Sequence, residues 1–153
     1  MTQFIRNIYS MTQSFWLLGS RLTILADRTT TDGKYDLIEG YSPPGMQTPP
    51  HRHTHYSEQL YVLQGEYTVW LGKNKVVLGI GESVLIPMGI PHVVATLGDR
   101  PARALVVSAP SAFAQLIAAT GTLNENEAPD LELFIRISTE IGDEILGVPG
   151  DIP

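Results

Sequence analysis

All four histidines of the chain lie in two short segments. The first segment contains His51, His53 and His55, followed by Glu58, and the second contains His92. Residues two apart on a strand face the same side, so His51 and His53 point together. Burying a carboxylate or a charged imidazole without a partner costs free energy. A shared divalent ion removes this cost, because it binds neutral imidazole nitrogen and ionised carboxylate oxygen. We therefore predict a metal site with the ligands His51, His53, Glu58 and His92.

The chain has no cysteine, which excludes disulfides, thiolate nucleophiles and cysteine-bound zinc. A metal must then be held by nitrogen and oxygen alone, and this leaves the first-row divalent ions Fe, Mn, Ni, Co, Cu and Zn open. We predict one such ion as the cofactor. Glu58 has a second predicted role, because a carboxylate in such a site can leave the metal and act as a catalytic base.

Size and composition indicate one globular domain, and we expect its partner to be a small-molecule substrate or ligand. The 153 residues are 43% hydrophobic and 17% charged, a composition that excludes a disordered chain. A net charge of −6, with no run of Lys or Arg, argues against nucleic acid as a partner. The apolar run at residues 15–18 is far shorter than a membrane span, and the N-terminus has no convincing targeting signal, so we predict a cytoplasmic location.

Short segments rich in strand-forming residues must position the predicted ligands. Candidate strands are an early apolar segment within residues 15–25 and the ranges 35–41, 58–64, 66–71, 76–78, 83–86, 93–97 and 103–108. Glycine and proline mark the turns between them, including a turn-rich break at residues 27–34. Glu58 shares a strand face with Leu60, and His92 with Val94, so both can point inward. Many short strands at this spacing indicate an antiparallel barrel or sandwich.

The pattern changes after Pro110, where apolar residues recur at helical spacing. Ser111 can cap a helix that continues through Ala119 and stops at Gly121, and Pro129-Asp130 can begin a second helix. We expect the apolar faces of these helices to pack on the outside of the barrel. The predicted organisation is an N-terminal arm at residues 1–14, a β-barrel at 15–110, and helices with an extended tail at 111–153.

Further residues around the histidines follow a fixed order. The first segment has Gly45, His51, His53, Glu58 and Gly65, with five residues after Gly45, four before Glu58 and six before Gly65. The second segment has Gly81, Pro87, Gly89 and His92. Both orders resemble the two motifs of the cupin family, and the surrounding residues resemble its single-barrel, quercetin 2,3-dioxygenase-like branch. Thr96 departs from the second motif, which usually has Asn at that position.

The resemblance implies a mainly β, single-domain jelly-roll barrel, a site of three histidines and one glutamate, and often a homodimer. It also places His55 outside the ligand set, because a pair formed by His53 and His55 would break the motif spacing. We interpret His55 as lying beside the ligands or at the surface. Candidate residues for the lining of the pocket are Tyr61, Met46, Met88 and Thr96.

The motifs are specific for the fold and the metal but not for the reaction, since this fold supports many activities. The first hypothesis is a quercetinase-like dioxygenase that acts on a small aromatic or enol substrate in an apolar barrel mouth. The second is a non-catalytic barrel that binds a small molecule or carries a structural metal. The third is a metal-dependent isomerase or epimerase, which we rank below the others because the sequence shows no second acid–base residue besides Glu58.

Overall fold

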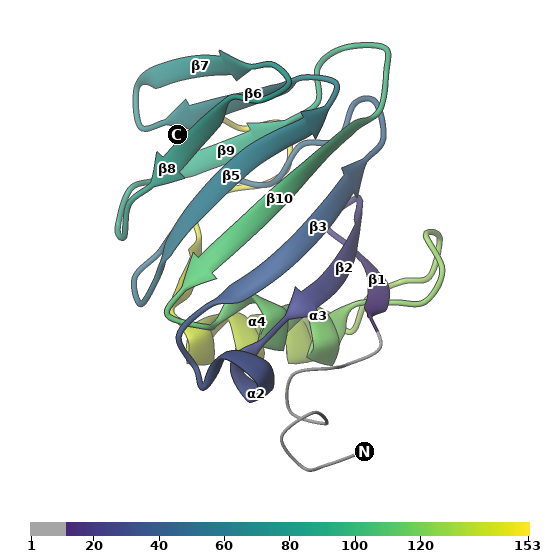
Figure 1. Cartoon of the computed structure of the whole chain (residues 1–153), viewed down its shortest axis with the longest axis vertical. Helices are drawn as coiled ribbons and strands as arrows, with labels where there is room; N and C mark the ends of the chain where they lie inside the picture. The colour runs from purple at the N-terminus through teal and green to yellow at the C-terminus, as the bar shows by residue number, and fades with distance from the viewer. Residues whose placement is uncertain (1–11) are drawn as a thin grey trace.

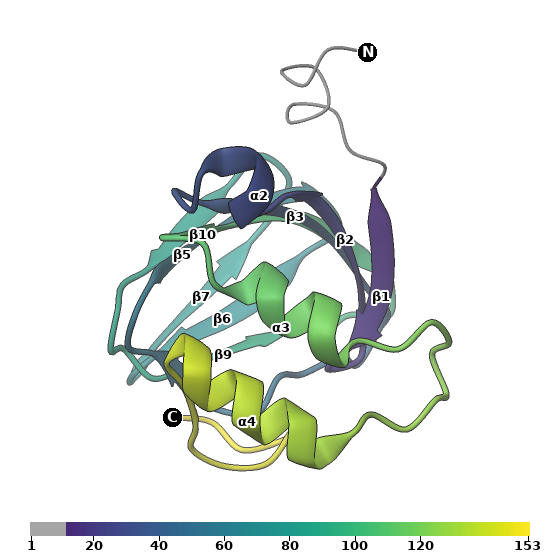
Figure 2. The same ribbon diagram turned by 90° about the horizontal axis from the view of Figure 1, so that it is seen from below.

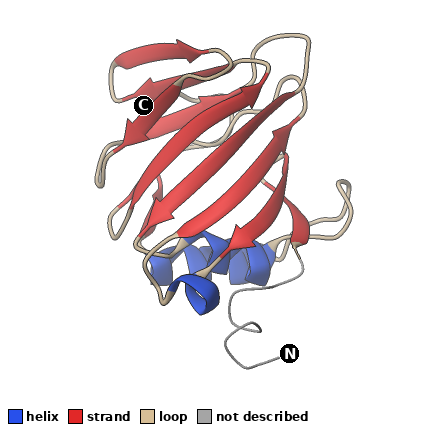
Figure 3. Cartoon of the chain, viewed as in Figure 1, coloured by secondary structure: helices blue, strands red, loops and turns tan. Residues whose placement is uncertain are grey.

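Two antiparallel sheets form the barrel in the computed structural model, which describes residues 12–153 (Figure 1, Figure 3). The larger sheet contains, in spatial order, β1 (Gln13–Leu17), β2 (Ser20–Ala26), β3 (Asp36–Ser42), β10 (Ala102–Ala109), β5 (Ser57–Gln64) and β8 (Ser83–Ile86). The smaller sheet contains β11 (Asp143–Ile145), β4 (His51–His53), β9 (His92–Ala95), β6 (Tyr67–Leu71) and β7 (Asn74–Leu78). The predicted mainly β barrel with C-terminal helices is confirmed.

The inner surface of the larger sheet follows from alternation along its strands. In β10 every second residue is buried and the residues between them are half-buried. β3 and β5 alternate in the same way, so one face of each strand points into the barrel. Gly40 on β3 pairs with Ala104 on β10, so two very small residues lie opposite each other in the middle of the sheet. This pairing leaves room inside the barrel.

Two helices cover one end of the barrel (Figure 2). Three residues separate the end of β10 from the start of α3 (Phe113–Thr120), and α4 (Leu131–Ile141) packs beside α3. We expected these helices on the outside of the barrel, but the short connection keeps α3 at the end of the sheet, and Leu116 and Phe134 line the interior cavity. None of the helices in residues 12–153 is long and apolar enough to cross a membrane.

A buried carboxylate fastens α3 to the barrel. Asp36, the first residue of β3, accepts hydrogen bonds from the Ser108 hydroxyl at 2.7 Å, from the backbone N–H groups of Ala112 and Ala114 at 2.8 and 3.0 Å, and from the Ser111 hydroxyl. The predicted capping role of Ser111 is wrong, because the N-cap is Ala112 and it has no side-chain cap. A carboxylate from a distant strand takes that role, and an anion at a helix N-terminus is favourable.

Several element boundaries differ from those expected. Residues 1–11 of the predicted arm lie outside the described residues, and β1 already begins at Gln13. The turn-rich break contains a one-turn helix, α2 (Arg28–Thr31). The predicted helix stop at Gly121 and helix start at Asp130 are confirmed. β11, which was not expected, lies between α4 and the tail at residues 147–153, and it pairs with β4 and so joins the sheet that carries two of the histidines.

Replacing Asp36 by Ala should lower the free energy of unfolding by about 3 kcal/mol, because buried donors lose a charged acceptor. The control is Asp130→Ala, which removes an exposed N-cap from α4 and should cost about 1 kcal/mol. Urea unfolding of the two variants and the unchanged protein measures both effects. Equal losses in the two variants would show that Asp36 is no more than an ordinary cap.

Candidate metal centre

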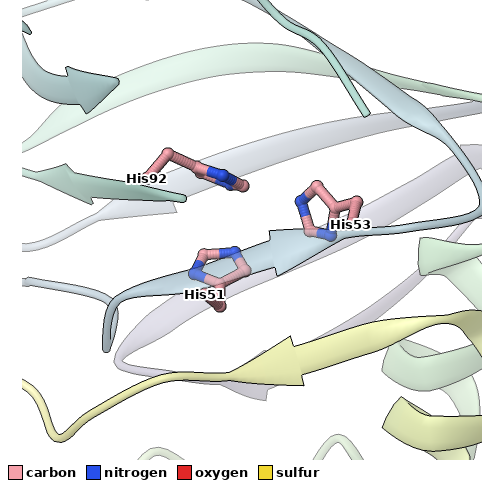
Figure 4. A group of neighbouring side chains, drawn as sticks. All are labelled: His51, His53 and His92. Atoms are coloured by element: carbon pink, nitrogen blue, oxygen red, sulfur yellow. The ribbon is translucent and has the colours of Figure 1, made fainter. Parts of the chain in front are cut away.

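Three imidazole rings meet inside the barrel (Figure 4). His51 and His53 come from β4, and His92 comes from the neighbouring strand β9, where it pairs directly with His51. One ring nitrogen from each histidine lies within 4.8 Å of the corresponding nitrogens of the other two. Within residues 12–153, the structure thus brings together the three histidines that the spacing predicted.

Each of the three rings is fixed through its Nδ1 atom. The partners are the Pro49 carbonyl for His51 at 2.8 Å, the Ile90 carbonyl for His92 at 2.9 Å and Asp143 Oδ1 for His53 at 2.7 Å. Carbonyl and carboxylate oxygens only accept, so we assign the proton to Nδ1 in each ring. The Nε2 atom of a neutral ring then keeps its lone pair, and metal-binding histidines are oriented by this kind of partner.

Two of these partners follow from a repeated local pattern. In both His51 and His92 the accepting carbonyl belongs to the residue two positions earlier, and a proline, Pro50 or Pro91, stands between. Proline fixes its own φ and restricts the residue before it to extended backbone. The Pro-His dipeptide therefore places the preceding carbonyl beside the ring in both segments.

Glu58 lies at the edge of the histidine group. It is buried on β5, and its Oε2 lies 3.2 Å from Nε2 of His53. The group whose ligand atoms all lie within 4.8 Å of one another contains the histidines alone, so the predicted fourth ligand stands next to the group and not inside it. The contact between Glu58 and His53 is close enough for an ion pair but does not have the geometry of a hydrogen bond.

The Nε2 atoms of His53 and His92 are buried and have no hydrogen-bond partner among the described residues. Leaving a buried polar atom unpaired costs about 1–3 kcal/mol, so two such atoms facing one space require an explanation. A divalent cation bound to Nε2 would satisfy both. Three imidazole nitrogens with a neighbouring carboxylate suit a first-row divalent ion, and the residues therefore fit the predicted metal.

The charges of the rings differ. Burial lowers the pKa of His51 and His92, and positive charge on a neighbouring histidine lowers both further, that of His92 to about 3, so both rings are neutral at pH 7. Burial also lowers the pKa of His53, but the hydrogen bond to Asp143 and the contact with Glu58 outweigh it and raise the pKa to about 9. Burial raises the pKa of Glu58, but His53 outweighs it and lowers the pKa to about 2. Without a metal, His53 and Glu58 are therefore an ion pair at pH 7.

Asp143 and Tyr56 were not expected at the site. Asp143 Oδ1 accepts hydrogen bonds from His53 Nδ1 and from the Tyr56 hydroxyl, both at 2.7 Å, and the Tyr56 ring stacks on His53 with centroids 4.3 Å apart. The pairing of β11 with β4 sets Asp143 opposite His53. The two residues are 90 positions apart, so no local pattern predicts the contact. The nearest sequence signal is the acidic residue that directly follows the helix-ending Gly142.

A cavity of about 90 Å³ adjoins the rings. His51, His53, Glu58 and Asp143 line it, and no Lys or Arg does so in the described part of the chain. Most of its walls are apolar, and among these residues are Leu22, Leu60, Val94, Val106, Leu116 and Phe134. The cavity therefore offers a small apolar space beside a group of polar ligands.

Met46 lines this cavity, as the sequence predicted. Tyr61 and Met88 do not, because both are exposed. Tyr61 lies on β5 an odd number of residues from Glu58, so the alternation of the strand turns it outward. Met88 lies in the turn between β8 and β9.

His55 and Thr96 lie outside the cavity lining for different reasons. His55 is exposed, and its ring packs over Gly142, where any side chain would come within 2.5 Å of the ring. Thr96 is buried, and its hydroxyl donates to the Pro43 carbonyl at 2.6 Å and accepts from the Met46 N–H at 3.2 Å. Thr96 thus holds the loop that carries Met46.

Comparison with known proteins agrees with this site. The cupin domain family matches residues 39–108. Over 77 residues, half of this chain, the sequence is 29% identical to quercetin 2,3-dioxygenase from Bacillus subtilis and 31% identical to an uncharacterized protein from Methanocaldococcus jannaschii. The matched segments cover 23% and 62% of those proteins, so the chain spans less than two thirds of the length of either relative.

Solved structures share the barrel. The polyketide cyclase RemF from Streptomyces resistomycificus superimposes with a TM-score of 0.58 at 27% identity, over 65% of this chain and 75% of that chain. The matched domain contains both histidine segments, and those segments lie on the strands that form the barrel. Residues 39–108 therefore form a cupin domain, and the barrel has the cupin fold.

Proposed function

We propose that this cupin is a metal-dependent enzyme that adds dioxygen to a small aromatic or enol substrate. The observation that carries the proposal is a group of three Nδ1-anchored histidines, of which His51 and His53 line a small apolar cavity together with the buried Glu58. His51, His53 and His92 would hold the ion, and Glu58 would be its fourth ligand or a base. A bound redox-active ion supplies Lewis acidity and electron transfer toward dioxygen.

Glu58 is the residue placed to move a proton. It is buried and lines the cavity, and it is ionised at neutral pH, so its carboxylate can accept a proton. The apolar walls exclude water from the reacting groups, and this strengthens the electrostatic interactions inside the cavity. The chain's own contribution is thus orientation of the ligands, a proton acceptor and a dry space.

The cavity favours a compact substrate. Its volume of about 90 Å³ is well below the 300–1,000 Å³ that is typical of pockets for drug-sized ligands. No Lys or Arg belongs to the described lining, so an anionic group of the substrate could pair only with the bound metal. We therefore infer a monocyclic aromatic compound or a short enol, and not a multi-ring flavonol.

Dioxygenation is the first candidate reaction because of the similarity to quercetin 2,3-dioxygenase, at 29% identity over 77 residues. A second candidate is metal-assisted acid–base chemistry, such as isomerisation, epimerisation or cyclisation. Asp143 favours this reading, because it adds a second carboxylate to the cavity lining that the sequence did not show. The 27% identity to a polyketide cyclase also supports it. The two candidates differ in whether they require oxygen.

Oxygen dependence separates the two reactions. We expect protein loaded with Fe, Mn, Ni, Co or Cu to turn over a catechol or β-diketone in air, to consume one O₂ per substrate, and to lose this activity under anaerobic conditions. His51→Ala should abolish turnover, whereas the control His55→Ala, which replaces an exposed histidine outside the group, should not. Equal turnover with and without oxygen would favour the acid–base reaction. Metal binding without turnover in either atmosphere would contradict both and favour a binding protein.

Asp143→Asn should weaken metal binding about tenfold, because carboxylate partners of ligating histidines orient the ring and increase its basicity. Asp143 also raises the pKa of His53, so the comparison is made near pH 9 in a chelator-buffered titration, where protons compete little. Glu144→Gln is the control, since Glu144 lies next to Asp143 but pairs with Arg52 in a partly exposed contact. Equal affinity of the Asp143 variant and the unchanged protein would contradict this role.

Metal binding should release about one proton near pH 7.5, because His53 has a pKa of about 9 without metal and must lose that proton to become a ligand. The metal Kd should therefore fall about tenfold for each pH unit between about 6.5 and 8.5, and level off above about 9. His51 and His92 are already neutral in this range and should add no protons. Calorimetry in buffers of different ionisation enthalpy counts the protons, and a pH-independent Kd would contradict the assignment.

A further inference from the structure

Three hydroxyl groups form a second polar group in the cavity. Ser20, Ser42 and Tyr67 are buried, and all three line the same cavity as His51 and His53. Ser42 Oγ lies 2.8 Å from Ser20 Oγ and accepts a hydrogen bond from the Tyr67 hydroxyl at 3.0 Å. The three residues come from β2, β3 and β6, so this hydroxyl cluster joins the two sheets across the interior.

The hydroxyl cluster has one more donor than it uses. Three hydroxyl groups carry three protons, and the cluster contains two internal hydrogen bonds. Because Tyr67 donates to Ser42, the remaining proton lies on Ser20 or on Ser42, depending on which serine donates to the other. No further acceptor for it occurs among the hydrogen bonds of the described residues. A purely structural tie between the sheets does not need this extra donor.

The register places the hydroxyl cluster away from the predicted metal ligands. Leu71 pairs with His92, and Tyr67 lies four residues earlier on β6, which is about 13 Å along the strand. In the larger sheet, Ser108 pairs with Glu58, and Ala102, six residues earlier on β10, pairs with Ser42. The wall between these two polar groups includes Leu22, Gly40, Val94 and Ala104.

We propose that the Ser20–Ser42–Tyr67 cluster is a second substrate-binding subsite, which donates a hydrogen bond to an acceptor oxygen at the end of the substrate remote from the metal. The ligand class is a narrow molecule with metal-binding oxygens at one end, an apolar middle, and a ketone, ether or hydroxyl oxygen at the other. The inference rests on the proposed function, because the first end needs the metal. It adds a reason why a particular small substrate would be chosen among others that fit the apolar walls.

The test compares two carboxylates of nearly the same shape, 5-oxohexanoate and 5-methylhexanoate, as ligands of the cobalt-loaded protein. Only the first has a distal acceptor oxygen. Calorimetry should show that 5-oxohexanoate binds about tenfold tighter, because a ligand oxygen pairs with an otherwise unused donor. A cavity with apolar walls alone would prefer 5-methylhexanoate, since burying a ketone without a partner is unfavourable. The proposed subsite therefore predicts tighter binding of 5-oxohexanoate, whereas an apolar pocket predicts tighter binding of 5-methylhexanoate.

A variant with Ser20→Ala, Ser42→Ala and Tyr67→Phe should reverse the preference and leave cobalt affinity unchanged. Removing the whole cluster leaves no unpaired member, so the fold should tolerate it better than a single change. The control Ser14→Ala/Thr23→Ala removes an exposed hydroxyl pair from the β1–β2 hairpin and should keep the preference. Equal or reversed affinities in the unchanged protein would overturn the subsite alone. If neither compound binds, the subsite is overturned, while the proposed function is decided separately by the oxygen dependence of catechol or β-diketone turnover.

Discussion

Three imidazole rings can present their free nitrogens to one buried space only when each ring has a fixed partner for its other nitrogen, because an unfixed ring can rotate. Here the partners are the Pro49 and Ile90 carbonyls and the Asp143 carboxylate. They leave the other nitrogens facing one another within 4.8 Å. The rest of the barrel can be understood as the structure that supplies these three acceptors and keeps water away from the nitrogens.

The exclusion of water depends on features far from the histidines. Small residues at Gly40 and Ala104 leave space in the larger sheet, and α3 and α4 cover the end of the barrel. α3 is held there by the buried Asp36 carboxylate, which binds both serine hydroxyls and backbone N–H groups of the helix start. The cavity therefore depends on two features, which are the small residues in the larger sheet and the hydrogen bonds of Asp36 that hold α3 at the end of the barrel.

The barrel, most of its strands and the grouping of the three histidines could be predicted because their signals are local. Alternation, turn residues and the His-x-His spacing act over a few positions, and even the Pro-His dipeptides that fix two of the rings lie within three residues. Asp143 and Asp36 could not be predicted, because each acts on a partner more than 70 positions away and has no distinctive neighbours. Tyr61 was assigned to the pocket although the parity of its strand turns it outward.

The pairing of β11 with β4 has a consequence for the order of assembly. His53 precedes its carboxylate partner by 90 positions, and a ribosome adds roughly 5–20 residues each second, so the partner emerges roughly 5–18 s later. During that interval the nascent barrel has its histidine strand but not the group that orients this ring. Stable uptake of the ion would then follow the docking of the last strand, and a chain cut by a protease between α4 and β11 would lose that step while keeping most of its core.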